Sequence, residues 1–332
     1  MDTTTIIVGN GLGMAIDKEY FTLDAGLKSA WEKLDADTQN RIKTLITNGS
    51  ELTTEEQLEK HYDVIQACMT LYYVENRYPD LKWLHEDAKK FSSCFYDFIR
   101  SAALYFFNYE DSENRLGPFI TSMKNFIKKN HSHLATLNYD KLLYSPLVTD
   151  LEIMDGYNGK LVDGLVDNGY GPDNLMPKFQ HIFGWYLHLH GSPLFYTAVT
   201  GLIKKDSLEN NLPVQTQKLY SHIILCNPRL KPMQIYQSEL LNSYWQYFRE
   251  ALSQSNQIIL LGYSGKDAHV NKAIEKALTH SKEIKIIEYD NKNDTDRENF
   301  WVAALGLKDS KFPEKNFHLN RMSSILDYRF DQ

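Results

Sequence analysis

The chain repeatedly places a glycine-rich or polar turn directly after a short apolar run, and this pairing constrains its fold more than any other feature. The first example is the β-branched run at residues 4–8, which ends at the turn 9–13. The same pairing recurs after the runs 133–137, 185–189, 222–225 and 257–261. Short apolar runs bounded by turns are typical of strands buried on both faces, as in parallel sheets covered by helices.

Between the runs, apolar residues recur every three or four positions, which predicts helices. The predicted strands are 4–8, 133–137, 151–154, 185–189, 222–225, 257–261 and 284–287, and the predicted helices of the second half are 115–130, 235–252 and 268–278. From Asp24 to about Tyr109 the pattern is helical, with Thr54 and Gln57 as an N-cap pair before an apolar stripe from Leu58 to Tyr72.

This alternation predicts an α/β fold, in which a Rossmann-like parallel sheet carries helices on both faces and a helical insertion follows the first strand. We expect one domain spanning residues 1–332. Its Rossmann-like core is predicted at 1–21 and 113–332, and its helical insertion at 22–112. In such sheets, ligands bind at the carboxyl ends of the strands, which is where the polar turns lie here.

The charge of the chain argues against a nucleic-acid-binding protein. Of its 332 residues 42% are apolar and 24% are charged, and its formal net charge is −7. Lys124, Lys128 and Lys129 form the one local basic cluster, and they indicate either the solvated side of a helix or a nucleic-acid patch. A protein that wraps nucleic acid needs a basic face, so we expect no direct nucleic-acid binding.

The cysteines and the apolar runs indicate a cytoplasmic protein. Cys68, Cys94 and Cys226 are odd in number and far apart, so they predict neither a disulfide framework nor a four-cysteine zinc site. No leader peptide is evident at the N-terminus. The longest apolar run, near 102–107, is far too short to cross a membrane, so we expect no membrane association.

The turn after the first predicted strand is a candidate phosphate-binding loop. It contains Gly9, Asn10, Gly11 and Leu12, followed by Gly13. Glycine lets the backbone approach a pyrophosphate closely, and amides at a helix start favour anions. The spacing is not that of the dinucleotide fingerprint, because Met14 stands at its sixth position. A tight strand-to-helix turn is the alternative interpretation.

Three further candidates follow the second and fourth predicted strands. Asn138 can donate and accept hydrogen bonds, which suits a site that holds a sugar hydroxyl and a water. Asp140 is either a site residue or the N-cap of a helix. His190, at a strand end before a glycine, is typical of a general base in a cleft. His188 shares its strand face and is predicted to be a core residue. Because no further ligands appear at a recognisable spacing, we expect no metal.

The last strands carry candidates for the other end of a nucleotide. Gly262 and Ser264 form a second glycine turn, and Ser264 can bind a phosphate or a ribose. Asp267 is a predicted N-cap for the next helix. Asp290, at the end of the final predicted strand, can accept from ribose hydroxyls. Asn291 beside it favours a surface turn as the alternative.

Taken together and in order, four motifs resemble the sirtuin-like superfamily. They are G-N-G at 9–11, T-L-N-Y-D at 136–140, L-H-G-S at 189–192 and L-G-Y-S-G-K-D-A-H-V-N at 261–271. The chain is most similar to the bacterial sirtuin-like NADases of anti-phage defence. Deacylating sirtuins also carry a four-cysteine zinc ribbon, which three scattered cysteines cannot form, and a serine at the position of Gly13.

The resemblance implies that His190 is the catalytic histidine, with Asn138 at the nicotinamide-ribose end and Asp140 shaping the nicotinamide pocket. Gly9, Asn10 and Gly11 would contact the pyrophosphate. Gly262, Ser264 and Asp290 would line the adenosine side.

The predicted activity is NAD+ glycohydrolysis without a metal, releasing nicotinamide and ADP-ribose, with NAD+ as the substrate. The alternatives are a non-catalytic NAD+- or ADP-ribose-binding module, a protein deacylase or ADP-ribosyltransferase, and a structural subunit of a defence complex. The family pattern further implies a homo-oligomer or a regulatory partner, either an ATPase or a nucleic-acid-guided protein. The helical insertion is the expected place for such contacts.

Overall fold

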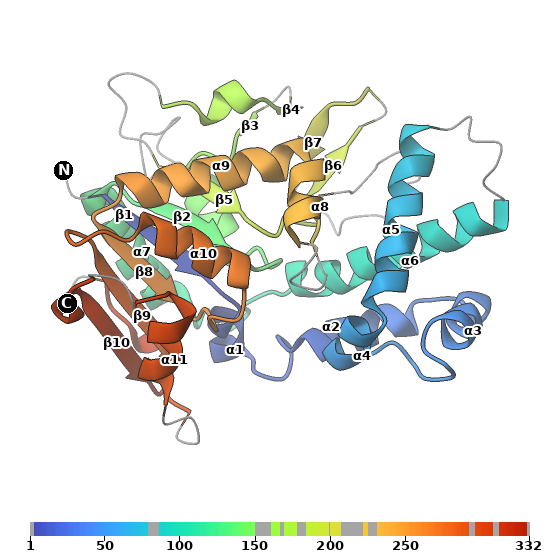
Figure 1. The fold of residues 1–332 in the computed structure, drawn as a ribbon, viewed down its shortest axis with the longest axis horizontal. Helices are drawn as coiled ribbons and strands as arrows, with labels where there is room; N and C mark the ends of the chain where they lie inside the picture. Colours follow the sequence, from blue (N-terminus) through green and yellow to red (C-terminus); the bar gives the residue numbers. More distant parts are fainter. Residues whose placement is uncertain are drawn as a thin grey trace.

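A six-stranded parallel sheet forms the centre of the protein (Figure 1). The computed structural model describes residues 3–78, 86–149, 161–166, 169–177, 184–198, 200–206, 222–224, 231–291, 296–307 and 312–330. The strands of this sheet are β1 (Thr4–Val8), β2 (His133–Thr136), β5 (Tyr186–His188), β8 (Gln257–Leu261), β9 (Glu283–Tyr289) and β10 (Phe317–Met322). Their order is β10-β9-β8-β1-β2-β5, and each neighbouring pair is parallel.

This strand order is that of a Rossmann fold. Numbered along the chain, the six strands lie in the spatial order 6-5-4-1-2-3, so the chain moves outward from β1 in one direction and then, from β8 onward, in the other. The order reverses between β1 and β8, where a doubly wound sheet opens a crevice at its carboxyl edge. The predicted α/β, Rossmann-like fold class is confirmed.

Helices flank the sheet and close its apolar core. They are α1 (Gly11–Ile16), α7 (Gly117–Asn130), α8 (Lys231–Gln237), α9 (Glu239–Gln254), α10 (Ala268–Ala277) and α11 (Arg297–Ala304), with α9 and α10 in front of the sheet in Figure 1. Every residue of β1 is buried, as a central strand covered on both faces requires. Trp185, Tyr244 and Phe248 are fully buried between the sheet and its helices.

Small elements complete this part of the chain. Two antiparallel hairpins pair β3 (Leu165–Val166) with β4 (Gly169–Tyr170) and β6 (Phe195–Thr197) with β7 (Ile203–Lys205). Short helical turns occur at η1 (Ser145–Thr149), η2 (Pro172–Leu175), η3 (Glu314–Asn316) and η4 (Ile325–Asp327). None of the described helices combines the length and the apolar character needed to cross a membrane.

The described part of the segment between β1 and β2 carries five further helices, which lie to one side of the sheet in Figure 1. They are α2 (Leu23–Glu32), α3 (Ala36–Leu45), α4 (Glu55–Lys60), α5 (Tyr62–Arg77) and α6 (Glu86–Phe107). Leu27, Phe95 and Phe98 belong to a second apolar cluster, separate from that of the sheet. The capping box of Thr54 and Gln57 starts α4 as predicted. The domain boundaries at 22 and 112 stay a prediction.

Two long apolar stripes are interrupted helices rather than continuous ones. The stripe from Leu58 to Tyr72 spans α4 and α5, with a break at His61. The predicted helix 235–252 is likewise two helices, because Ser238 is extended and its hydroxyl accepts from the Leu241 N–H. Apolar spacing continues across such a break, so the pattern alone could not locate it.

The predicted strands agree with the described sheet except at two places. The strand β10 was missed; apolar and polar residues alternate only from Phe317 to Asn320, and the strand is mostly half-buried. The predicted strand 222–225 is wrong in its described part, where Ile223 forms only an isolated antiparallel bridge with Gly191. The predicted strand 151–154 lies outside the described residues, as does Cys226, whereas Cys68 and Cys94 are free thiols.

Candidate functional site

A cavity of about 780 Å³ lies at the carboxyl edge of the sheet, at the switch between β1 and β8. This is large enough for a nucleotide-sized ligand. The structure brings eight of the predicted site residues to its wall: Gly9, Asn10, Gly11, Asn138, Asp140, His190, Gly262 and Ser264. These residues come from the ends of four strands, β1, β2, β5 and β8.

The two glycine turns pack backbone against backbone beside the cavity. A Cβ atom on Gly9 would lie 2.6 Å from the Tyr263 Cα, and one on Gly262, whose φ is +59°, would lie 2.8 Å from the Leu12 backbone nitrogen. The Gly11 N–H donates to the Gly262 carbonyl at 2.8 Å. The glycines thus build a tight strand-to-helix turn, and the same close packing leaves bare backbone on the cavity wall.

Asn138 presents an unsatisfied acceptor at the cavity. Its side chain is buried, and its Nδ2 donates to the Gly9 carbonyl at 3.2 Å, which ties the end of β2 to the end of β1. Among the described residues its Oδ1 has no hydrogen-bond partner. A buried acceptor without a partner is costly, so this atom marks a position where a ligand donor would bind favourably.

Asp140 is a buried carboxyl with a perturbed pKa. Its Oδ1 accepts from the Leu142 N–H at 3.1 Å, so it shapes a local turn and caps no α-helix. Burial raises its pKa from 3.8 to about 6, against the opposing effect of hydrogen bonds from Leu142 and Asn138. A carboxyl that titrates near neutral pH at a cavity wall is suited to proton transfer.

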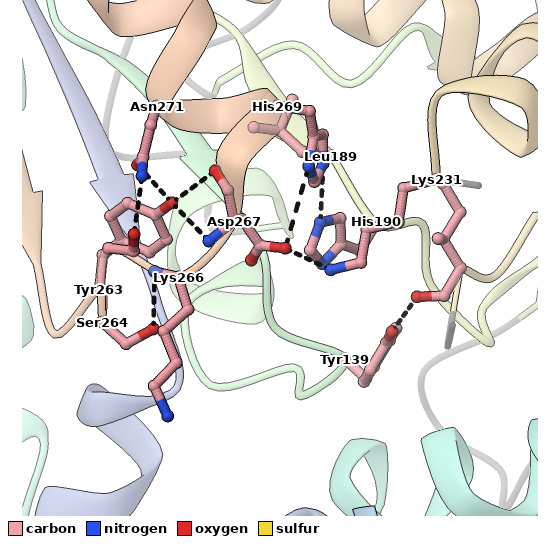
Figure 2. Close-up of polar contacts among 12 residues, drawn as sticks. Tyr139, Leu189, His190, Lys231, Tyr263, Ser264, Lys266, Asp267, His269 and Asn271 are labelled. Atoms are coloured by element: carbon pink, nitrogen blue, oxygen red, sulfur yellow. Dashed lines mark hydrogen bonds and ion pairs between the residues drawn. The ribbon is translucent and has the colours of Figure 1, made fainter. Parts of the chain in front are cut away.

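His190 lies against a second histidine at the cavity (Figure 2). Its Nε2 is 3.4 Å from the Nε2 of His269, and the two rings stack with centroids 5.5 Å apart. Burial and the charge of Lys231 lower the pKa of His190 well below its usual range, although Asp267 opposes the shift. His190 is therefore a neutral imidazole at physiological pH, which is the form a general base requires.

Asp267 and Lys231 form a largely buried ion pair next to these histidines. The Lys231 ammonium contacts the Asp267 carboxylate, and their side chains are 11% and 18% exposed. Burial opposes ionisation of Asp267, but the neighbouring His190 and Lys231 outweigh it and hold its pKa below the usual value. Asp267 occupies the predicted N-cap position of α10, but its side chain makes no capping hydrogen bond to the helix.

His190, Asp267 and His269 come close enough to share a cation, since their ligand atoms all lie within 4.8 Å of one another. The Lys231 ammonium already contacts the Asp267 carboxylate. A metal ion there would place a second cation against the same oxygen atoms. We therefore describe the group as a cluster of polar side chains and not as a set of metal ligands.

The far end of the cavity is lined by charged residues around the end of β9. The Arg297 Nη2 is 2.7 Å from Glu288 Oε2, and the Trp301 Nε1 donates to the same carboxylate at 3.0 Å. Glu288, Arg297 and Arg321 line the cavity. Asp290 does not, and its carboxylate instead pairs with Arg321 at 3.2 Å.

The helical insertion closes another side of the cavity. Leu23, Asp24, Glu55, Leu58, Glu59 and Phe106 line it from α2, α4 and α6. The Glu55 N–H donates to the Asp24 Oδ1 at 2.8 Å, which joins the start of α4 to α2. The site is thus built from both the sheet and the insertion.

Comparison with known proteins identifies the family. The SIR2-like domain family matches residues 132–308, which is more than half of the 332-residue chain. The chain belongs to the SIR2-like domain family. This membership confirms the resemblance to the sirtuin-like superfamily. A search of curated proteins found no match to this SIR2-like chain.

Solved sirtuin structures are similar to this SIR2-like chain at low sequence identity. One, on the structural basis for the mechanism and regulation of Sir2 enzymes, is 10% identical with a TM-score of 0.43 and covers 99% of this chain and 91% of its own. A second, on sirtuin substrate affinity, is 10% identical with a TM-score of 0.42 and covers 97% and 90%. A third is Sir2Tm bound to a propionylated peptide, 10% identical with a TM-score of 0.37, covering 97% and 89%.

Several residues at or near the cavity lie where the sequence did not place them. Leu12 is fully buried in the core and does not line the cavity. The Asn10 Nδ2 donates to the Phe21 carbonyl at 2.7 Å, so its amide holds the loop. Lys231 and Glu288 were missed. Glu288 could have been predicted from the same strand-end pattern that indicated Asp290. No local sequence pattern indicates that Lys231 belongs to the cavity.

Proposed function

We propose that this chain is an NAD+ glycohydrolase that cleaves the bond between nicotinamide and ribose. The proposal is carried by the convergence of Asn138, Asp140 and His190 on one cavity, beside the Gly9 turn and at the switch point of a Rossmann sheet. Membership of the SIR2-like family supports NAD+ as the substrate. Asn138 presents a free acceptor and His190 a neutral imidazole to the same space.

Cleavage of the nicotinamide–ribose bond depends more on positioning the ribose and one water than on a strong acid or base. Nicotinamide leaves as a neutral group from a cationic ring, and positive charge then builds on the ribose. The enzyme must hold the ribose, exclude bulk water and deliver one water molecule. His190 takes a proton from a ribose hydroxyl or from that water, and Asn138 orients the sugar or the water through its amide.

The remaining wall residues fit the rest of the substrate. The backbone of Gly9 and Gly11, with Asn10 beside it, lies where the pyrophosphate would cross the sheet edge. Gly262 and Ser264 lie on the adenosine side, with the charged group of Glu288 beyond them. Asp290 then acts through its pair with Arg321, because its own carboxylate does not line the cavity.

The biological role we propose is that of a cytoplasmic, triggered effector that depletes NAD+ in bacterial anti-phage defence. Loss of NAD+ is toxic, so such an enzyme has to be inactive until it assembles or meets a regulatory protein. The helical insertion lines the active cavity, so a contact on its outer surface has a direct route to the site. A homo-oligomer, an ATPase and a nucleic-acid-guided protein are the candidate partners.

The test measures nicotinamide released from NAD+ by the wild type and by His190→Ala and Asn138→Ala, with and without candidate partners. We expect both variants to fold and to lose turnover. His318→Ala, a half-exposed histidine on β10, is the matched control and should keep full activity. Unchanged nicotinamide release by both site variants would refute the assignment. Tight NAD+ binding without release by the partner-activated wild type would favour a binding module, and transfer to or from a protein lysine would favour a deacylase or an ADP-ribosyltransferase.

A further inference from the structure

Behind His190 lies a buried chain of polar side chains that the proposed reaction does not yet use. We infer that His269 and Asp267 are positioning residues, which hold His190 in one tautomer and stabilise its protonated form, with Lys231 fixing Asp267 in place. The inference rests on the proposed function, because it assigns these residues to the general base of that reaction. Figure 2 shows the four side chains in contact.

The four side chains follow one another in space in the order His190, His269, Asp267 and Lys231. Nε2 of His190 faces Nε2 of His269 at 3.4 Å. The other ring nitrogen of His269, Nδ1, is 3.9 Å from Asp267 Oδ1 and has no hydrogen-bond partner among the described residues. That gap exceeds a hydrogen bond, but catalytic hydrogen bonds are often long before substrate binds and tighten in the complex. The Lys231 ammonium lies on the same Asp267 oxygen.

The turn that carries Asp267 and His269 is held rigidly. The Tyr263 hydroxyl accepts from the Asp267 N–H at 3.2 Å and donates to Asn271 Oδ1 at 2.7 Å. Trp245 of α9 packs against the His269 ring, with centroids 4.9 Å apart. The distance between the two histidines is therefore set by the fold and does not depend on free side-chain rotation.

A purely structural role explains this arrangement poorly. Burying an ion pair generally costs as much solvation energy as the pair returns, so the Lys231–Asp267 pair is weak evidence for stabilisation. Two neutral histidines stacked beside it add packing that a phenylalanine would supply without polar atoms to satisfy. Clusters of this kind are found more often where a side chain must be held in a given protonation state.

This series of side chains determines which ring nitrogen of each histidine carries the hydrogen. The Asp267 carboxylate favours hydrogen on Nδ1 of His269, which leaves the His269 Nε2 lone pair facing His190. His190 then carries its hydrogen on Nε2 and takes a proton at Nδ1, and a backbone hydrogen bond to the Leu137 carbonyl also favours the protonated ring. When Nδ1 takes the ribose or water proton, the imidazolium donates its Nε2–H to His269, whose Nδ1–H faces Asp267. No proton leaves His190 in this step, and the two positive charges, on His190 and Lys231, flank one carboxylate.

Two arms test the inference. The first measures ring-nitrogen shifts of the histidines by NMR at pH 7, with signals assigned from His190→Gln and His269→Gln. We expect hydrogen on Nε2 of His190 and Nδ1 of His269, and in Asp267→Asn we expect His269 to lose this preference. This arm needs no turnover, so it remains decisive if the chain releases no nicotinamide. Hydrogen on Nδ1 of His190, or no change in Asp267→Asn, overturns the inference.

The second arm measures steady-state kinetics of nicotinamide release by the activated protein. Asp267→Asn and His269→Ala should lower kcat at least tenfold with KM nearly unchanged. The loss should stay below the factor of about 10²–10⁴ that a general base supplies, because His190 itself remains. His269→Gln, which keeps an acceptor toward His190, should recover part of that loss, whereas the control His318→Gln should match the wild type. An active wild type with full kcat in Asp267→Asn and His269→Ala overturns the inference while leaving the proposed function intact. An inactive wild type counts against the function alone.

Discussion

At the scale of single residues, Asp140 links the stability of the fold to pH. Burial raises the pKa of its carboxyl from 3.8 to about 6, so the folded protein holds this proton more tightly than the unfolded chain does. The stabilisation of the folded state by this more tightly held proton is fully present below pH 3.8. It is lost as the pH rises through the window from 3.8 to 6. Above that window, the buried carboxylate costs roughly 3 kcal/mol.

Replacing Asp140 with asparagine removes this cost and keeps the shape of the side chain. At pH 7.5, urea unfolding should show Asp140→Asn to be more stable than the wild type by up to roughly 3 kcal/mol, and the difference should vanish below about pH 4. Nicotinamide release should fall at the same time. Asp37→Asn on α3, with a side chain 67% exposed, is the control and should show no such pH dependence. A difference that is constant across pH would contradict the assigned cause.

Residues at strand ends were predictable, and contacts between distant residues were not. Asn138, Asp140 and His190 follow buried strands, and parallel strands bring their carboxyl ends to one edge, so their meeting follows from the pattern. Asp267 stands at the N-cap of α10 as expected, but its carboxylate binds Lys231, which is 36 residues away, and does not cap the helix. No local spacing encodes such a partner.

At the scale of elements, the contact between the turns after β1 and β8 depends on glycine. A Cβ on Gly9 would meet the Tyr263 Cα at 2.6 Å and the Gly262 carbonyl oxygen at 2.7 Å, and neither backbone atom can move away alone. Gly9→Ala should therefore separate the strand ends, lower the free energy of unfolding by roughly 1–3 kcal/mol and abolish NAD+ binding. Gly171→Ala, whose Cβ would meet only the Asn174 side chain, should behave as the wild type in both assays.

Lys282 joins α9 to the start of β9 away from the cavity. Its ammonium donates to the carbonyls of Leu252, Ser253 and Ser255 at 2.5, 2.8 and 2.7 Å, at the C-terminal end of α9. A cation there satisfies carbonyls that a helix end leaves unpaired. Lys282→Met should lower the free energy of unfolding by roughly 2–3 kcal/mol, while nicotinamide release per folded molecule stays unchanged.

Lys28→Met, at an exposed position in the middle of α2, is the matched control for Lys282→Met. Its melting temperature should equal that of the wild type. If both lysine variants lose the same stability, the loss reflects general charge and not the helix cap.

Elements with a strong local signal were predicted, and those that depend on their neighbours were not. The capping box of Thr54 and Gln57 placed the start of α4 correctly. The strand β10 lies at the edge of the described sheet beside β9, and its residues are mostly half-buried, so it lacks the apolar run that marked the central strands. Ser238 interrupts a stripe whose apolar spacing continues beyond it.

At the scale of the whole molecule, the sheet and the insertion form a single ligand cavity. The order of the strands places its opening between β1 and β8, and helices α2, α4 and α6 supply another of its walls. The sequence predicted a helical segment after the first strand, but not that it would line the site. Residues more than a hundred positions apart, such as Leu58 and His190, line the same cavity, and only folding brings them to it.

A ligand that fills this cavity should stabilise the sheet and the helical insertion together. The melting temperature then reports binding, whereas nicotinamide release reports turnover. His190→Ala retains the rest of the wall, so NAD+ should raise its melting temperature and the shift should persist. At a ligand concentration of 100 times Kd, the expected stabilisation is about 2.7 kcal/mol. In the activated wild type the shift should decay as NAD+ is consumed, at the rate at which nicotinamide appears. A stable shift in both proteins, with no nicotinamide, would show that the cavity binds NAD+ without cleaving it, because binding alone then accounts for the whole effect.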